Sequence, residues 1–196
     1  MIYIGIDPGL DGGIAFIERT GLRVHKTPII GGKDYDIQDM KNLLEPFQGS
    51  VDTFCTIENQ ISMPGQGLTS TLQTGKGFGI WLGLLAGLEV PHQVVHAKQW
   101  QTKLFSGTSS KLDTKARSEI VAKRLFPKAD FRRSERARVA NDGLTDAACI
   151  AEYGRRTHSV GDPGTGIEHT PLKSSPEICS VCGRYIPGDA TGCFTS

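Results

Sequence analysis

The sequence predicts an α/β domain, a mixed β-sheet layered with helices, followed by an irregular C-terminal tail. Over residues 1–156, short β-rich runs alternate with stretches whose apolar residues recur at helical spacing, the pattern of a layered α/β fold. Asp11-Gly12-Gly13 joins the first two runs, which is typical of a hairpin and therefore of an antiparallel pair. Residues 157–196 contain ten Gly or Pro and few large apolar side chains, so we place a domain boundary between 156 and 157.

Strands are predicted wherever β-branched and aromatic residues cluster between turn residues. Such runs cover residues 2–6, 13–17, 22–28, 53–57 and 91–96. The first run ends directly at Asp7, which Pro8-Gly9 follows as a turn signal, and the fourth ends directly at Glu58.

Helices are predicted from apolar residues three or four positions apart. They cover residues 36–47, 74–88, 97–105, 112–125 and 141–153, with Asp36 as the N-cap of the first. Many glycines weaken the second, but its apolar run is too long for a strand. The residues expected on buried helical faces are Ala116, Ile120, Val121 and Leu125 in the fourth helix and Ala147, Ile150 and Ala151 in the last. Residues 61–67 are predicted to form a loop, and the polar stretch 62–72 a flexible segment.

Four carboxylates stand where they can share one site. Asp7 and Glu58 lie side by side if their strands are neighbours, and Asp142 and Asp146 share one face of a helix. Oxygen ligands from three elements favour a hard cation, Mg²⁺ or Mn²⁺. Two such ions about 4 Å apart can activate a water and stabilise the leaving oxygen of a phosphodiester. Simpler roles stay open: a turn residue for Asp7, an N-cap for Asp142 and a solvated first-turn acid for Asp146.

The tail carries a second candidate metal site. Cys179 and Cys182 form a CxxC pair, and Cys193 follows. Thiolates at this spacing suit zinc, with His169 or His158 as a fourth ligand, and the alternative is a tail of reduced cysteines. An odd number of cysteines argues against a disulfide framework.

Three segments taken together resemble the RuvC-type Holliday junction resolvases, which are RNase H-like nucleases. They are Ile4-Gly5-Ile6-Asp7-Pro8-Gly9, Ile57-Glu58 and Asp142-Gly143-Leu144-Thr145-Asp146-Ala147. Residues 78–83 and 146–154 are most similar to the phage and plant-organelle branch. The resemblance covers roughly residues 1–156, and the order and spacing of the segments carry it.

The resemblance implies an RNase H-like fold and a Mg²⁺-dependent endodeoxyribonuclease. Asp7, Glu58 and Asp146 match the metal-binding acids of the family. Bacterial members carry Asp or His three positions before the last acid, where this sequence has Gly143, so the role of Asp142 one position earlier stays open. The family also implies a homodimer that nicks a four-way DNA junction symmetrically.

Basic residues gather in one part of a chain whose net charge is only +1. Residues 111–138 hold ten Lys or Arg against four acids, a local excess of +6. The proposed DNA contacts are Lys111, Lys115, Arg132, Arg133, Arg136 and Arg138. The alternative is a solvated helix face. The segment 62–72 follows Glu58 and is also expected to contact the junction.

Two other functions compete with junction resolution. Actin-like and sugar-kinase ATPases also open with a strand, an Asp and a hairpin, but they need a second phosphate loop, which is not evident after residue 100. A nuclease of the same fold acting on other branched DNA or on RNA–DNA hybrids is the other alternative. No apolar run of about 18 residues exists, so no membrane span is expected. Because a strand begins at residue 2, we expect no signal peptide and a cytoplasmic location, in a bacterium or a phage-infected cell.

Overall fold

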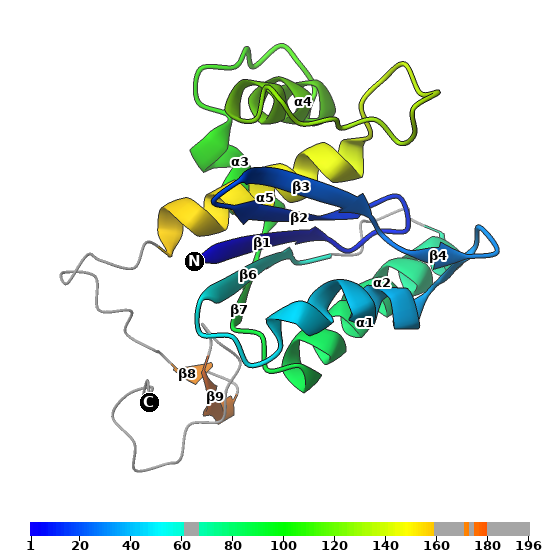
Figure 1. The fold of residues 1–196 in the computed structure, drawn as a ribbon, viewed down its shortest axis with the longest axis vertical. Helices are drawn as coiled ribbons and strands as arrows, with labels where there is room; N and C mark the ends of the chain where they lie inside the picture. Colours follow the sequence, from blue (N-terminus) through cyan, green and yellow to red (C-terminus); the bar gives the residue numbers. More distant parts are fainter. Residues whose placement is uncertain (61–66, 159–170, 173–174, 180–196) are drawn as a thin grey trace. The chain divides into compact units, whose positions relative to one another are not determined.

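A computed structural model describes residues 1–60, 67–158, 171–172 and 175–179 of the chain (Figure 1). The chain divides into two units, Met1–His158 and Ser159–Ser196. In the second unit, β8 (Pro171–Leu172) pairs antiparallel with β9 (Ser175–Cys179). All the remaining described elements belong to the first unit.

A five-stranded mixed sheet organises the first unit. Its strands are β1 (Ile2–Asp7), β2 (Gly13–Glu18), β3 (Gly21–Lys26), β6 (Thr53–Glu58) and β7 (His92–Val95). The order across the sheet is β3-β2-β1-β6-β7, with β1 antiparallel to β2 and parallel to β6. β2 pairs antiparallel with β3, and β6 pairs parallel with β7. The predicted mixed sheet and all five of its strands are therefore confirmed.

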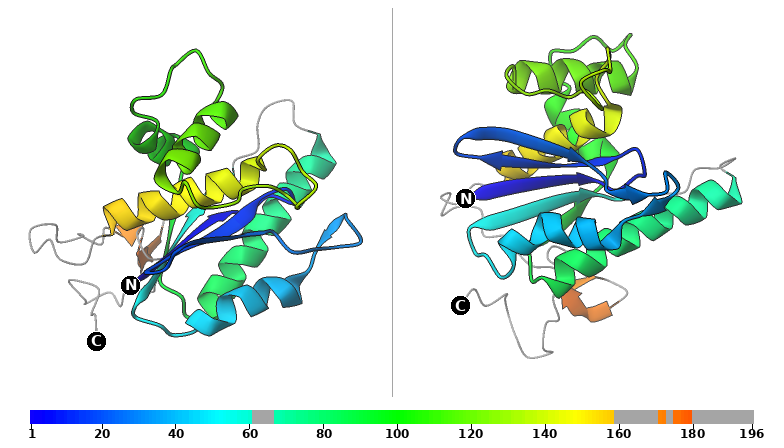
Figure 2. Two further views of the ribbon diagram at one scale, coloured as in Figure 1. Left: turned by 45° about the horizontal axis from the view of Figure 1, so that its top comes forward. Right: turned by 45° about the vertical axis from the view of Figure 1, so that its right-hand side comes forward.

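Helices cover both faces of this sheet, as the views in Figure 2 show. On one face lie α3 (Ala97–Leu104), α4 (Thr114–Leu125) and α5 (Asp142–Thr157). On the other lie α1 (Ile37–Leu44), the 3₁₀ turn η1 (Glu45–Phe47) and α2 (Leu68–Gly87). A short pair, β4 (Ile29–Ile30) with β5 (Asp34–Tyr35), leads into α1. As predicted, Asp36 caps α1, and its side chain accepts a hydrogen bond from the amide of Asp39 at 3.1 Å.

The alternation of side chains along the strands gives the unit two apolar cores. Ile4, Ile6, Ile14 and Phe16 are fully buried against the α1 and α2 layer. Ala15 belongs to the core on the opposite face, with Ala147 and Ile150 of α5. One face of the sheet therefore packs large aliphatic residues, and the other packs small residues that let a helix approach.

Glycines allow α5 to lie directly on β1. A Cβ atom at Gly5 would collide with the carbonyl oxygen of Ala147 and the amide nitrogen of Ala151. At the start of α5, a Cβ at Gly143 would collide with the carbonyl oxygen of Asp11 in the hairpin turn. Main-chain contact therefore sets the position of α5 over the central strand.

Three sequence-based expectations were wrong in detail. α2 begins at Leu68, so residues 68–72, expected in a flexible loop, are helical. Ile120 is 44% exposed, whereas Val121 is buried as predicted, and α4 also buries Ser118 and Ala122. α5 continues to Thr157 rather than ending at 153, and Arg155 and Arg156 of its last turn both pair with the buried Glu152 at 2.7 Å. None of the helices in the described ranges is long and apolar enough to cross a bilayer.

Candidate metal and nucleic-acid site

Asp7 and Glu58 lie next to each other at one edge of the sheet. β1 and β6 are parallel neighbours, with Ile6 paired to Ile57, so the next residue of each strand is one of these acids. Asp7 Oδ1 accepts long hydrogen bonds from the amide of Gly9 at 3.4 Å and from Gln60 Nε2 at 3.5 Å. Glu58 Oε2 accepts a hydrogen bond from Trp100 Nε1 at 2.6 Å.

Asp146 reaches the same edge from α5. Its carboxylate accepts a short hydrogen bond from the hydroxyl of Ser118 on α4. Its charge acts on both strand-end acids, since it raises the pKa of Asp7 and of Glu58. The structure thus brings together three acids that are 51 and 88 residues apart along the chain, from 7 to 58 and from 58 to 146.

Burial is the main cause that raises the pKa values of these three acids. Burial, followed by repulsion from Asp146 and Glu58, raises the pKa of Asp7 to about 8. Burial raises the pKa of Glu58 to about 7, although the Trp100 hydrogen bond opposes the shift. Burial raises the pKa of Asp146 to about 6, against the opposing hydrogen bond from Ser118. Such values are typical of a site that binds protons or cations.

Asp142 takes a more exposed position. It is the first residue of α5, and its carboxylate pairs with Lys115 Nζ of α4 at 2.7 Å. The N-cap is Asn141, whose side chain accepts a hydrogen bond from the amide of Leu144 at 3.1 Å, so an N-cap role for Asp142 is wrong. Asp142 is close enough to raise the pKa of both Asp7 and Asp146. It therefore borders the three acids from the solvent side.

The donor set fits a hard divalent cation. Within the described parts of the chain, no group of three or more His, Cys, Asp and Glu side chains forms a ready metal site. Two of the acids instead bond to Trp100 and Ser118. Mg²⁺ does not need a protein cage, because it retains waters and accepts phosphate oxygens beside one or two carboxylates. Buried carboxylates that gather at one sheet edge meet that requirement.

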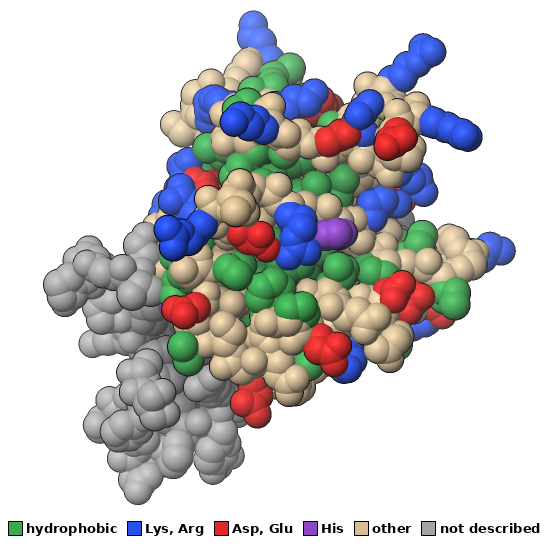
Figure 3. Space-filling view, viewed as in Figure 1, with side chains coloured by type: hydrophobic (Ala, Val, Ile, Leu, Met, Phe, Trp, Pro, Cys, Tyr) green, Lys and Arg blue, Asp and Glu red, His purple; other side chains and the backbone are tan. Residues whose placement is uncertain are grey.

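Basic side chains gather on α4 and on the segment that follows it, along the top of the view in Figure 3. Residues 131–141 form a hairpin-like loop, in which Arg132 bridges to Ala140 and the amide of Asn141 donates to the carbonyl of Phe131 at 2.7 Å. Phe131 is buried and anchors this loop. The loop leads directly into α5, so its basic side chains lie on the approach to the acids.

The predicted DNA-contacting residues differ in what they already bind. Arg132 is held by Asp130 at 2.7 Å, and Lys115 is held by Asp142. Four exposed cations form no ion pair within the described residues: Lys111, Arg133, Arg136 and Arg138. The three free arginines all belong to the exposed tip of the 131–141 loop.

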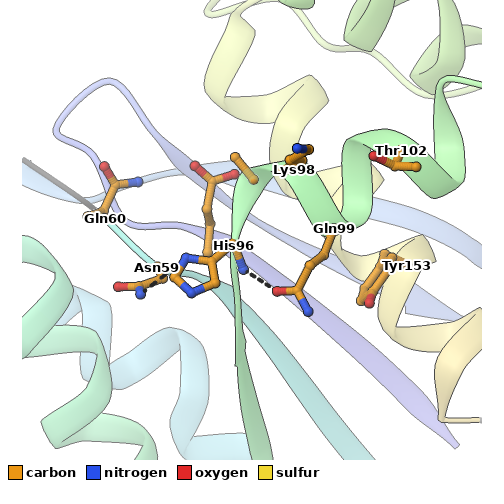
Figure 4. Close-up of a pocket in the computed structure, with 9 residues that line it drawn as sticks. Asn59, Gln60, His96, Lys98, Gln99, Thr102 and Tyr153 are labelled. Carbon is orange, nitrogen blue, oxygen red and sulfur yellow. Dashed lines mark hydrogen bonds between the residues drawn. The ribbon is translucent and has the colours of Figure 1, made fainter. Parts of the chain in front are cut away.

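A pocket of about 980 Å³ adjoins Glu58 on the side of β7 and α3 (Figure 4). The residues that line it come from the end of β6, the start of α3 and one position of α5: Glu58, Asn59, Gln60, His96, Ala97, Lys98, Gln99, Thr102 and Tyr153. The amide of His96 donates to Gln99 Oε1 at 2.7 Å, which fixes the start of α3.

Sequence reasoning missed the side chains that hold the acids in place. Ser118, Trp100 and Gln60 were not singled out, yet each contacts one of the three carboxylates. Trp100 is fully buried, and a buried indole N–H needs an acceptor, which is a signal that a polar partner lies nearby. A serine on the buried face of α4 is a similar signal.

The proposed zinc ligands cannot be described from the structure. Cys182, Cys193 and His169 lie outside the described residues, and only the backbone of Cys179 is described, in β9. The alternative ligand His158 belongs to the first unit, where its ring stacks on Phe54 with centroids 3.6 Å apart. Cys55 and Cys149 are buried free thiols, as expected.

No protein-family model and no curated protein matches this sequence. Solved structures do. RuvC of Thermus thermophilus in complex with a Holliday junction substrate is 15% identical, with a TM-score of 0.52, over 81% of this chain and 96% of that one. A second structure of Thermus thermophilus RuvC is 19% identical, with a TM-score of 0.51, and the match covers 80% of this chain and 96% of that one. The yeast mitochondrial Holliday junction resolvase Ydc2 is 15% identical, with a TM-score of 0.48, and the match covers 78% of this chain and 77% of that one. The two RuvC structures show that the chain has the RuvC fold, the RNase H-like mixed sheet flanked by helices that the sequence resemblance implied.

Proposed function

We propose that this chain, which has the RuvC fold, is a metal-dependent endodeoxyribonuclease that resolves four-way DNA junctions. One observation carries the proposal: Asp7, Glu58 and Asp146, from three separate elements, come together at one sheet edge, where burial and mutual repulsion raise the pKa values of Asp7 and Glu58 and burial raises that of Asp146. The activity is assigned to residues 1–156. The tail, 157–196, is assigned a small zinc-binding knuckle.

Asp7, Glu58 and Asp146 are proposed to hold two Mg²⁺ or Mn²⁺ ions, with Asp142 as a further ligand. Bound ions would supply an activated water and charge stabilisation for the leaving oxygen of the phosphodiester. Asp7 sits centrally, because its pKa responds to all three of the other acids. Trp100 and Ser118 orient Glu58 and Asp146 through hydrogen bonds to one carboxylate oxygen of each acid.

Basic residues beside the acids are proposed to position the DNA backbone. Lys111, Lys115 and the arginines at 132, 133, 136 and 138 surround the approach to α5. Phosphate contacts of this kind set register without reading sequence. Lys115 pairs with Asp142 in the free protein. An incoming phosphate would therefore compete with Asp142 for Lys115, and a metal ion would compete with Lys115 for Asp142.

The branched substrate and the homodimer rest on the likeness to RuvC, whose structure with a Holliday junction substrate has the same fold. A four-way junction has two-fold symmetry, and a two-fold dimer presents two acid clusters to opposite strands. Symmetric nicking would follow from that geometry.

Cleavage by an Asp7→Asn variant tests the proposal. The variant should cut a four-way junction in Mg²⁺ about 10² to 10⁴ times more slowly than wild type, because removal of one catalytic group commonly costs that much in rate. Junction binding, measured in Ca²⁺ by fluorescence anisotropy, should persist. Asp11→Asn is the matched control, since it removes an exposed carboxylate from the same turn.

A substrate panel separates the alternatives. Junction, fork, flap and RNA–DNA hybrid substrates are offered at equal concentration in Mg²⁺, and the junction should be cut fastest. If an RNA–DNA hybrid is cut faster than the junction, the proposed activity is hybrid cleavage and not junction resolution. Cleavage of the junction by Asp7→Asn at the wild-type rate would refute the assignment of the acids.

A further inference from the structure

The pocket beside Glu58 adjoins the space that the three acids share, because Glu58 lines it and Gln60, another lining residue, donates to Asp7 Oδ1 at 3.5 Å. In Figure 4, Gln60 and Tyr153 of α5 lie on opposite sides of the pocket, with the start of α3 between them. Its volume of about 980 Å³ is at the upper end of the range for small-molecule sites. A strand bound at the acids would therefore lie next to this pocket, since the two share Glu58.

The side chains of the pocket suit a nucleobase. The NH₂ groups of Asn59 and Gln60 form long hydrogen bonds of 3.5 Å to His96 Nδ1 and Asp7 Oδ1, which leaves their amide oxygens as acceptors for a base edge. Gln99 uses its oxygen to hold the amide of His96, which leaves its NH₂ group as a donor. A phosphate presents only acceptors, so a site for it needs only donors. Three amides around one pocket supply acceptors as well, which a base edge can use.

Tyr153 supplies a flat surface on the same pocket. Its ring is partly exposed, and Lys103 Nζ lies 5.7 Å from the ring centroid. Aromatic rings next to cations are the usual stacking platforms for unpaired bases. Lys98, which is exposed on the same pocket, adds a positive charge within reach of the adjoining backbone.

We infer that this pocket binds one unstacked base of the strand that is cut, with Tyr153 as the stacking surface and the amides of Asn59, Gln60 and Gln99 facing the base edge. The inference rests on the proposed function and adds a base-binding subsite to it. A base held there would fix the position of the strand relative to Glu58, and the amides would make cleavage depend on sequence.

Abasic scanning of the substrate tests this inference. Single abasic sites are placed at each position within four nucleotides of the cut, and single-turnover cleavage is measured for wild type, Tyr153→Phe and Tyr153→Leu. At one position the abasic site should slow wild type and Tyr153→Phe about tenfold, since stacking on an aromatic side chain has an effect of that order. Tyr153→Leu should cut the intact junction about tenfold more slowly and should be insensitive to the same abasic site.

The outcomes separate the two proposals. If wild type cuts the junction but no abasic position distinguishes it from Tyr153→Leu, the base pocket is refuted and the nuclease remains. If wild type cuts no branched DNA, the proposed function falls, and the pocket inference falls with it. Thermal unfolding of each variant and an abasic site far out on one arm serve as controls.

In addition, Asn59→Ala should flatten the preference among the four bases at the sensitive position, and an unchanged preference would refute the role of that amide.

Discussion

Replacing Asp7 with Asn should stabilise the metal-free protein near neutral pH while it abolishes activity. The pKa of Asp7 rises from 3.8 to about 8 on folding. Because the folded-state pKa is the higher one, folding binds a proton between these values, and stability falls as pH rises through that window. The slope for one proton is about 1.36 kcal/mol per pH unit.

The size of the effect follows from that slope. The full rise from 3.8 to about 8 corresponds to about 6 kcal/mol, and the interval from pH 5 to 7.5 covers about 3.4 kcal/mol of it. Water entry and relaxation of the site reduce such costs. We therefore expect the free energy of unfolding of Asp7→Asn to gain about 2 kcal/mol on wild type between pH 5 and pH 7.5.

Urea unfolding in EDTA, followed by circular dichroism at several pH values, measures this difference. Excess Mg²⁺ should reverse it, because ion binding stabilises wild type by about 2.7 kcal/mol at a hundred times the dissociation constant. Asp11→Asn controls for the loss of a charge as such. Parallel pH curves for wild type and Asp7→Asn would show that the Asp7 carboxylate is not desolvated among other acids, and the electrostatic reasoning would fail.

Three further predictions address the packing, the loop and the tail. Gly5→Ala should cost more than about 3 kcal/mol in urea unfolding or prevent folding, because its Cβ would collide with the main chain of α5; a cost below about 1 kcal/mol would contradict that packing. Arg136→Ala should reduce the salt dependence of junction binding by about 0.9 in log–log slope and Arg132→Ala by less, since Asp130 already holds Arg132; equal slopes would contradict this ranking. Full-length protein should contain about one zinc per chain by mass spectrometry, and replacing Cys179 and Cys182 with Ser should remove it; no zinc in wild type would leave the tail without a metal.

The pairing of the acids at one sheet edge was predictable because it depends on short-range patterns. Asp7 and Glu58 each end a β-rich run, and parallel neighbouring strands bring their carboxyl ends to the same edge. That β1 and β6 are neighbours could not be read from the runs alone. The placement of Asp146 depends on the contacts of Gly5 with α5 and of Gly143, within α5, with the hairpin turn, and these contacts are visible only in three dimensions.

Other features of the chain were misjudged because tertiary contacts override local signals. The start of α2 was predicted too late, because residues 68–73 are mostly polar and appeared to continue the flexible stretch that follows Glu58, whereas they are helical. The partners Trp100 and Ser118 come from α3 and α4, 42 and 28 residues away from the acids that they hold. Sequence spacing carries no information about such pairs. Asn141 and Asp142 are both good capping residues, and local propensity alone did not distinguish them.

The direct contact of α5 with β1 has a consequence for how this protein can change over time. Backbone atoms meet at Gly5 and Gly143, so the offset between helix and strand does not depend on the shape of any side chain. Substitutions that reshape the apolar layers can therefore accumulate without shifting Asp146 away from Asp7. Substitutions in the apolar interior can therefore leave the chemistry at the sheet edge unchanged. Gly5 and Gly143 themselves tolerate scarcely any replacement, because a Cβ atom at either position would collide with the main chain.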